Sequence, residues 1–305
     1  MPTVGETGEF ALIARITERL AAPPPPLGPG DDAAVVPAPD GRVVATTDLL
    51  VEGRHFRLDW SSPVDVGYKA AAQNLADVAA MGARPTALLV GLVAPSTLAV
   101  EIAEGFADGL RAGAVAGRAL VVGGDVVRGN EVVLSVTALG DLEGQEPVLR
   151  SGARPGHVVV VAGRLGWSAA GLRLLQDGVR SGRLVDAHRR PAPPYVLGPE
   201  LARLGASSLI DVSDGLAADL GHIASASGVR LDLDLDRLRL LGTDGVRDEE
   251  LWSGGEDHAL AGTVPAEFVQ QLPPAAVVVG TVRAGRPAVT VDGSPVTGGW
   301  DHYRS

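Results

Sequence analysis

Residues 62–83 read SPVDVGYKAAAQNLADVAAMGA, and this stretch decides how the first half of the chain folds. It opens with a serine and a proline, which suit the cap and the first position of a helix, and Gly82 suits its end. We therefore predict one helix. Apolar runs typical of strands flank it, VVATTDLL at 43–50 and TALLVGLVA at 86–94. A helix between two strands predicts a domain in which helices cover a sheet.

The same alternation continues along the chain, and a polar, turn-rich segment at 143–156 interrupts it. We expect a domain boundary near 141–152, with an N-terminal domain at 1–140 and a C-terminal domain at 150–305. Hairpin-like strand pairs favour two α/β or α+β domains over one parallel Rossmann sheet. Helices are predicted at 8–20, 97–117, 166–178, 198–205 and 216–228, and strands at 32–38, 41–50, 86–94, 118–127, 131–142, 157–163, 207–211, 276–285 and 288–293.

Composition excludes several classes of protein. The net charge of −11 argues against nucleic acid and anionic membranes as partners. Lys69 is the only lysine and lies outside any glycine loop, so the chain is no P-loop NTPase. It has no cysteine, which excludes disulfides, thiolate metal sites and cysteine nucleophiles. No signal peptide or membrane-spanning run is visible, and we expect a cytoplasmic protein.

Aspartates recur beside apolar strands or glycines, although aspartate is a poor strand residue. Any one of them is more simply explained as a turn or cap residue. Together they predict a site for Mg²⁺, which prefers carboxylate and hydroxyl oxygens and binds polyphosphates. Asp77 is predicted to share a helix face with Asn74 and Gln73. The set comprises Asp31 and Asp32 in GPGDDAAVV, Asp48 after Thr46 and Thr47, Asp77, Asp125 after two glycines, and Asp211 and Asp214 in LIDVSDG.

Two further features fit a phosphate ligand. The glycine-rich segments VVGGDVVRG and GRLGWSAAG would let backbone N–H groups approach phosphate oxygens, and Arg150 is a candidate phosphate ligand. Each of these signals is weak alone. The chain has no HExxH histidine pair, so zinc hydrolase chemistry is poorly supported.

From residue 8 to 303 the chain resembles the thiamine-monophosphate kinase family, within the aminoimidazole-ribonucleotide-synthetase-like superfamily. The resemblance rests on GEFALIARI, GPGDDAAVV, TTDLLVEGRHF, YKAAAQNLADVAAMGARP, VVGGDVVRG, RSGARPG, GWSAAGL, IDVSDGLAADLGHI, SGGEDHAL and GWDHY, in that order. It implies an N-terminal α/β domain that binds ATP and Mg²⁺ and forms a sheet barrel with a second copy. The C-terminal domain would be α+β, with ATP lying between the domains.

The resemblance also implies an activity and roles for residues. ATP would phosphorylate thiamine monophosphate to thiamine diphosphate, the last step of thiamine diphosphate biosynthesis, with several Mg²⁺ ions. ATP contacts would be Gly124, Asp125, Arg150 and Ser213, and substrate contacts His55, Glu256 and Trp300. Metal ligands would be Asp31, Thr46, Thr47, Asp48, Asp77, Asp125, Asp211 and Asp214, and the catalytic set Asp31, Asp48, Asp77, Asp125 and Asp214. Asp32 would be structural.

Simpler explanations stay open for three of these residues. His55 fits a surface histidine, Glu256 a cap and Trp300 a core tryptophan. One segment departs from the family pattern, because FADGL carries Ala107 where relatives often have the tyrosine of FYEGL. We therefore expect an aromatic contact to the nucleotide to be missing.

The chemistry needs no protein base, since a phosphate monoester with a second pKa near ~6 is largely dianionic at neutral pH. No phosphoenzyme is predicted. Two other activities and one non-catalytic role are alternatives. Aminoimidazole ribonucleotide synthetase would use the same nucleotide site, but GGED and GWDHY argue against it. Selenophosphate synthetase normally needs a cysteine or selenocysteine. A non-catalytic subunit that binds metal and nucleotide stays open.

Overall fold

The computed structural model describes residues 2–20 and 36–300, which form two compact units. Unit 1 comprises residues within 1–78 and 85–141, and unit 2 comprises 79–84 with residues from 142 onward. Segment 79–84 packs inside unit 2, where the Val148 N–H donates to the Met81 carbonyl at 3.0 Å. No described helix is long and apolar enough to cross a membrane.

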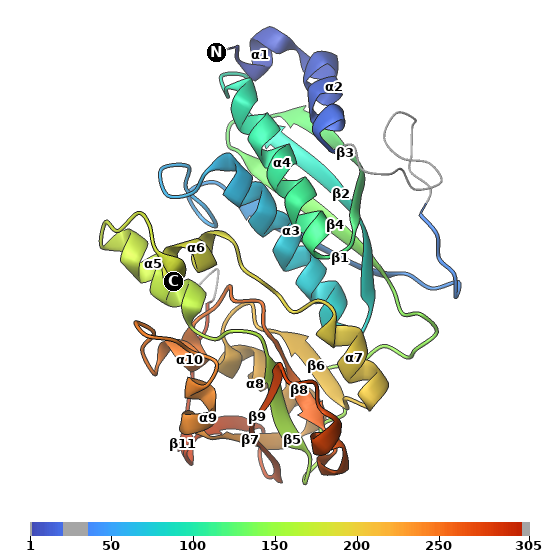
Figure 1. Cartoon of the computed structure of the whole chain (residues 1–305), viewed down its shortest axis with the longest axis vertical. Coiled ribbons are helices and arrows are strands. Elements are labelled where there is room, and N and C mark those ends of the chain that lie inside the picture. The colour runs from blue at the N-terminus through green and yellow to red at the C-terminus, as the bar shows by residue number, and fades with distance from the viewer. Residues whose placement is uncertain (1, 21–35, 301–305) are drawn as a thin grey trace. The chain divides into compact units, whose positions relative to one another are not determined.

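Unit 1 is built on a four-stranded sheet of order β1-β4-β2-β3. β1 runs antiparallel to β4, and β2 runs parallel to β3. Figure 1 shows α3 and α4 together on one face of this sheet. The strands are β1 (Val44–Val51), β2 (Arg84–Ala94), β3 (Leu120–Arg128) and β4 (Val133–Asp141), and the helices are α1 (Val4–Thr7), α2 (Glu9–Leu20), α3 (Pro63–Ala80) and α4 (Val100–Ala116).

The helix predicted from the opening stretch is confirmed as α3. The Asp65 N–H donates to the Ser62 hydroxyl at 3.2 Å, and the Ser62 N–H donates to the Asp65 carboxylate at 3.0 Å, so the cap is reciprocal. Gly82 follows the helix with a φ of +74°. The strand predicted at 32–38 is wrong in its described part, because residues 36–38 are irregular. The sequence there alternates proline with other residues, and proline cannot donate to a strand ladder.

Glycines allow α3 and α4 to pack with their backbones in contact. A Cβ on Gly67 would lie 2.1 Å from the Phe106 carbonyl oxygen, and one on Gly109 would lie 2.1 Å from the Val64 carbonyl oxygen. Gly105 and Gly113 continue the row one turn away on either side of Gly109 and also face α3. The glycines that lower the helix propensity of α4 are therefore its contact surface.

Unit 2 is an α+β unit with a seven-stranded sheet of order β11-β10-β7-β9-β5-β8-β6. Its core is an apolar cluster in which Leu216, Leu220 and Ile223 of α8 pack with residues of the strands. The strands are β5 (Val158–Ala162), β6 (Ser208–Asp211), β7 (Val229–Leu233), β8 (Leu260–Val264), β9 (Ala276–Ala284), β10 (Ala288–Val291) and β11 (Ser294–Pro295). The helices are α5 (Trp167–Gln176), α6 (Arg183–Arg189), α7 (Leu197–Leu204), α8 (Leu216–Ser227), α9 (Leu235–Arg239), α10 (Glu250–Ser253) and the 3₁₀ helix η1 (Ala266–Gln271).

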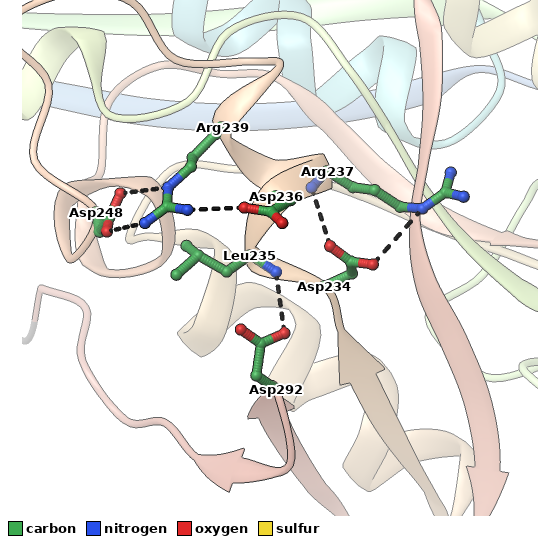
Figure 2. A network of polar contacts seen from close by, with 7 residues as sticks. All are labelled: Asp234, Leu235, Asp236, Arg237, Arg239, Asp248 and Asp292. Carbon is green, nitrogen blue, oxygen red and sulfur yellow. Dashed lines mark hydrogen bonds and ion pairs between the residues drawn. The ribbon is translucent and has the colours of Figure 1, made fainter.

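The acidic run after β7 has a structural explanation (Figure 2). Asp234 caps α9 by accepting from the Arg237 N–H at 3.1 Å. Arg239 bridges Asp236 and Asp248 with contacts of 2.7 and 2.6 Å. These carboxylates are matched by arginines, and they stabilise a short helix.

We predict that Gly109→Ala lowers the free energy of unfolding by about 1–3 kcal/mol, because the added methyl overlaps the α3 backbone. Gly221→Ala is the matched control, since Gly221 lies inside α8 and a Cβ added there would meet no atom within 4 Å. That variant should gain about 0.5–1 kcal/mol from helix propensity. Urea denaturation measures both. A stabilised Gly109→Ala would contradict the close helix contact.

Candidate functional site

In unit 1, α3 presents polar side chains to the edge strand β1. The Thr46 hydroxyl donates to the Asp77 carboxylate at 2.9 Å. Asn74 accepts from the Asp48 N–H at 3.0 Å, which satisfies a backbone donor on the open edge of the strand. Gln73 donates to the Asp48 carboxylate at 3.3 Å. The predicted shared face of α3 is confirmed, and it gathers Thr46, Asp48 and Asp77.

Thr47 and Asp125 lie on the other face of the same sheet. The Thr47 hydroxyl donates to the Val136 carbonyl at 3.0 Å and accepts from Thr137. Asp125 pairs with Gly91, where a Cβ would contact Ser135 on the face that Thr137 also occupies. β1 and β3 are the two edges of the sheet, about 14 Å apart by ordinary strand spacing. The strands of unit 1 therefore do not bring Asp125 beside Asp48.

Gly124 and His55 occupy tightly defined backbone positions. A Cβ on Gly124 would lie 2.0 Å from the Val90 carbonyl oxygen, so β3 accepts only glycine there. His55 lies in the turn after β1, where its Nδ1 accepts from the Val51 N–H at 3.0 Å. This bond leaves the ring proton on Nε2 in the neutral histidine, so that nitrogen is a donor.

In unit 2, three carboxylates gather where β6 ends and α8 begins. Asp211 ends β6 and is buried, Asp214 follows it in the loop, and Asp219 lies in the first turn of α8. Asp219 accepts from the N–H groups of Asp214 and Gly215 at 3.2 and 3.0 Å. Burial, reinforced by the negative charges of Asp211 and Asp214, raises the pKa of Asp219 to about 8. The negative charges of Asp211 and Asp214 thus lie together at this edge of the sheet, while Asp219 is protonated at neutral pH.

Segment 256–258 is bound to that edge. Glu256 and His258 have left-handed φ angles of +62° and +51°, which residues other than glycine rarely adopt. Two backbone hydrogen bonds hold the segment: the Glu256 N–H donates to the Ser213 carbonyl at 2.7 Å, and the His258 N–H donates to the Val212 carbonyl at 2.9 Å. A side-chain contact adds to them, since the His258 Nδ1 lies 3.1 Å from the Asp211 carboxylate. The predicted nucleotide residue Ser213 and the predicted substrate residue Glu256 are therefore directly joined.

Asp257 holds the middle of this segment by its side chain. Its carboxyl group accepts from the Gly166 N–H at 2.5 Å and the Ser168 N–H at 2.9 Å, at the start of α5. Burial raises the pKa of Asp257 to about 7, although the two N–H groups act in the opposite direction. The Asp257 carboxyl group thus links the GGED and GWSAAG motifs, which are distant in sequence.

Two more predicted residues lie on loops of unit 2. The Trp300 N–H donates to the Asp214 carbonyl at 3.0 Å. Its side chain is 54% exposed, so the alternative of a core tryptophan is wrong. Arg150 is exposed, and its carbonyl accepts from the Ser227 hydroxyl, which itself accepts from the N–H groups of Gly152 and Ala153 at 3.1 and 3.2 Å. One serine therefore fixes the Arg150 loop.

Asp31 and Asp32 lie outside the described residues, so the structure leaves their predicted roles as predictions. Within the described residues, no group of three or more Asp, Glu or His side chains is arranged to hold a metal ion. Sequence reasoning missed Asp219, Asp257 and His258. The position of Asp219 in the first turn of α8 was a signal that could have identified it. Asp257 and His258 could have been identified by their adjacency to Glu256.

Comparisons with known proteins agree on one family. Residues 30–142 match the family model described as AIR synthase related protein, N-terminal domain. A thiamine-monophosphate kinase from Mycobacterium tuberculosis is 49% identical over 99% of this chain and 93% of its own length. The chain belongs to the thiamine-monophosphate kinase family. The Bacillus subtilis thiamine-monophosphate kinase is 36% identical over 85% of this chain and 84% of its own.

Solved structures of thiamine-monophosphate kinases share the fold. The enzyme from Stenotrophomonas maltophilia K279a superposes with a TM-score of 0.81 at 36% identity, covering 95% of this chain and 98% of its own. A structure described as AaThiL complexed with AMPPCP and TMP gives 0.77 at 33% identity over 98% of both chains. The expected aminoimidazole-ribonucleotide-synthetase-like fold is confirmed. Ala107, where this family often has tyrosine, is 2% exposed within α4.

We predict that the free energy of unfolding of Asp257→Asn, relative to wild type, rises between pH 4 and pH 7. The raised pKa means that wild-type Asp257 favours folding fully below its unfolded pKa of about 4 and loses this contribution as the pH approaches about 7. Asparagine has no proton to lose. Denaturant unfolding at several pH values measures the difference, and Asp186→Asn, at an exposed position, provides the surface control. A difference that falls with pH would contradict the assignment.

Proposed function

We propose that this chain transfers the γ-phosphoryl group of ATP to thiamine monophosphate, giving ADP and thiamine diphosphate, the last step of thiamine diphosphate biosynthesis. The full-length relationship carries the proposal, because a thiamine-monophosphate kinase is 49% identical over 99% of the chain. A related structure is described as a complex with AMPPCP and TMP, an ATP analogue and the acceptor class expected here. The cytoplasmic location stays a prediction.

The reaction is a direct in-line displacement. An oxygen of the substrate phosphate attacks the γ-phosphorus, and the bond from that phosphorus to the β,γ-bridging oxygen breaks, with the electron pair leaving on ADP. The attacking phosphate is already largely dianionic at neutral pH, so no proton has to be removed. The protein's task is to position two polyanions and to offset their repulsion, about 4 kcal/mol for each unit-charge pair at ~4 Å and an effective dielectric near 20.

The donor set of the site suits Mg²⁺. Its side chains are carboxylates and hydroxyls, the hard oxygen ligands that Mg²⁺ prefers. The described carboxylates come in small groups, and Mg²⁺ is usually held by one or two carboxylates together with substrate phosphates and water. Bound Mg²⁺ would supply positive charge to the transferring phosphoryl group. We assign this role to Thr46, Asp48, Asp77, Asp211 and Asp214, and on the resemblance alone to Asp31, Thr47 and Asp125.

Substrate contacts follow from charge and exposure. Thiamine carries a positively charged thiazolium ring, which the Glu256 carboxylate would attract. The exposed indole of Trp300 offers a flat apolar surface to the same cation. His55 presents its Nε2 donor to an acceptor on the substrate. Backbone and side chains of Gly124, Asp125, Arg150 and Ser213 are the proposed ATP contacts, with Arg150 suited to pairing with phosphate.

A homodimer is the proposed assembly, and the face of the unit 1 sheet opposite α3 and α4 supports it. Strand alternation places Leu49, Leu89 and Val127 on that face, because they lie two residues from Thr47, Gly91 and Asp125, respectively. They are 52%, 39% and 52% exposed. Thr47 and Asp125 share this face. Exposed apolar side chains on three strands of one sheet face suit an interface with another protein chain. A second copy covering this face would also lie beside Thr47 and Asp125, the two predicted Mg²⁺ ligands that lie on the face opposite Asp48.

We predict that Asp214→Asn lowers kcat/KM for thiamine diphosphate formation by about 10²-fold or more, because it removes charge that holds the metal and phosphates. Product formation from ATP, thiamine monophosphate and Mg²⁺ measures this, with EDTA expected to abolish it. Asp236→Asn, at an exposed position on α9, should stay within about twofold of wild type. Folded wild-type protein that binds Mg·ATP without turnover would overturn the proposal in favour of a regulatory subunit.

Leu49→Lys should convert the dimer to a monomer, because it places a charge in the apolar face. Light scattering after size-exclusion chromatography measures the mass. Leu240→Lys is the matched control, since Leu240 is 71% exposed in unit 2 and belongs to no strand of this sheet. A wild-type protein that is monomeric, or an unchanged Leu49→Lys dimer, would contradict the proposed interface.

A further inference from the structure

The short helix α6 lies unusually close to α5, and a glycine permits this. A Cβ on Gly171 of α5 would lie 2.1 Å from the Leu184 carbonyl oxygen and 2.9 Å from the His188 Cβ. Because residue 171 has no side chain, the α6 backbone rests on α5 and the His188 ring reaches the first turn of that helix. The position of His188 is thus set by backbone contact.

His188 joins α5 to the proposed substrate residue. Its Nδ1 lies 3.0 Å from the Ser168 hydroxyl and 3.5 Å from the Glu256 carboxylate. His188 and Ser168 are buried, whereas the Glu256 side chain is 34% exposed. A buried polar pair therefore faces the inner side of a carboxylate whose outer side is accessible to a ligand.

Glu256 needs such support because its backbone alone does not fix its carboxylate. The left-handed φ and the bond to Ser213 fix its Cα, and the neighbouring Asp257 anchors the chain at α5. The side chain still has three rotatable bonds, and ordering a mobile glutamate side chain on ligand binding costs entropy. A donor held rigidly next to the carboxylate reduces that cost.

We propose that His188 is a positioning residue for thiamine monophosphate binding. With Nδ1 protonated, its N–H is shared between the Ser168 hydroxyl oxygen at 3.0 Å and the Glu256 carboxylate at 3.5 Å, and this contact holds the carboxylate for the cationic ring of the substrate. The inference rests on the proposed kinase function and deepens it. It assigns α6 and the first turn of α5 to the substrate site, and it places His188 outside the phosphoryl-transfer chemistry.

A double-mutant cycle on steady-state kinetics tests this. His188→Leu should raise KM for thiamine monophosphate about tenfold, the effect of losing one polar contact to a charged group, with kcat and KM for ATP within about twofold. In a Glu256→Ala background the same change should have no further effect on KM, since His188 acts through Glu256. His188→Asn, which keeps an N–H near the Nδ1 position, should recover most of the lost affinity.

Two more variants serve as controls. His222→Leu changes an exposed histidine of α8 that lies outside this network and should leave all constants unchanged. Ser168→Ala removes only the hydroxyl that orients His188 and should raise the same KM about threefold, which keeps the test available if His188→Leu does not fold.

The outcomes separate the two levels of the proposal. An active wild type whose KM for thiamine monophosphate is unmoved by His188→Leu and Ser168→Ala overturns the positioning role alone. Additive effects of His188→Leu and Glu256→Ala, or a parallel loss in KM for ATP, also overturn it, because they indicate a general structural role. Absence of product from wild type, ATP, Mg²⁺ and thiamine monophosphate overturns the kinase function and this inference together.

Discussion

The buried carboxyl group of Asp257 at the start of α5 is the contact on which the unit 2 site depends. It accepts two N–H groups there and holds a segment whose flanking residues have left-handed backbones. Such backbones cost of order 1–3 kcal/mol each and persist only where surrounding contacts impose them. Because Asp257 points into the core, its neighbours Glu256 and His258 are directed to His188 and to Asp211. The Asp257 carboxyl group therefore sets the positions of two neighbouring functional side chains, those of Glu256 and His258.

The second organising feature is a concentration of negative charge. Around α9, the aspartates are paired with arginines and stabilise local structure. At the β6–α8 junction, Asp211 and Asp214 add to the effect of burial in raising the pKa of Asp219. Folding stability alone gives no reason to keep such a cluster, whereas binding of a cation and a polyphosphate does. The aspartates around α9 are therefore structural, whereas the aspartates at the β6–α8 junction form a candidate functional site.

Most elements and the family could be predicted from the sequence, because helix caps, periodicity and motif order are local features. Asp48 and Asp77 were predicted together, and Gln73, Asn74 and Asp77 do share a helix face. Prediction failed where tertiary contacts decide. The bond from Asp257 to Gly166 spans 91 residues, and α6, which carries His188, is too short to show a pattern. Strand alternation and strand order also place Thr47 and Asp125 apart from Thr46 and Asp48, which residue type alone could not indicate, and the metal role of Thr47 and Asp125 stays a prediction.

In the proposed reaction the substrate phosphate attacks ATP directly, while the protein supplies position and charge. Transfer of a γ-thiophosphoryl group made chiral with oxygen isotopes, read by ³¹P NMR of the thiamine diphosphate product, tests it most directly. A single in-line displacement predicts inversion of configuration at phosphorus. Retention would show two successive displacements through a phosphorylated protein side chain, and would rule out direct attack by the substrate phosphate.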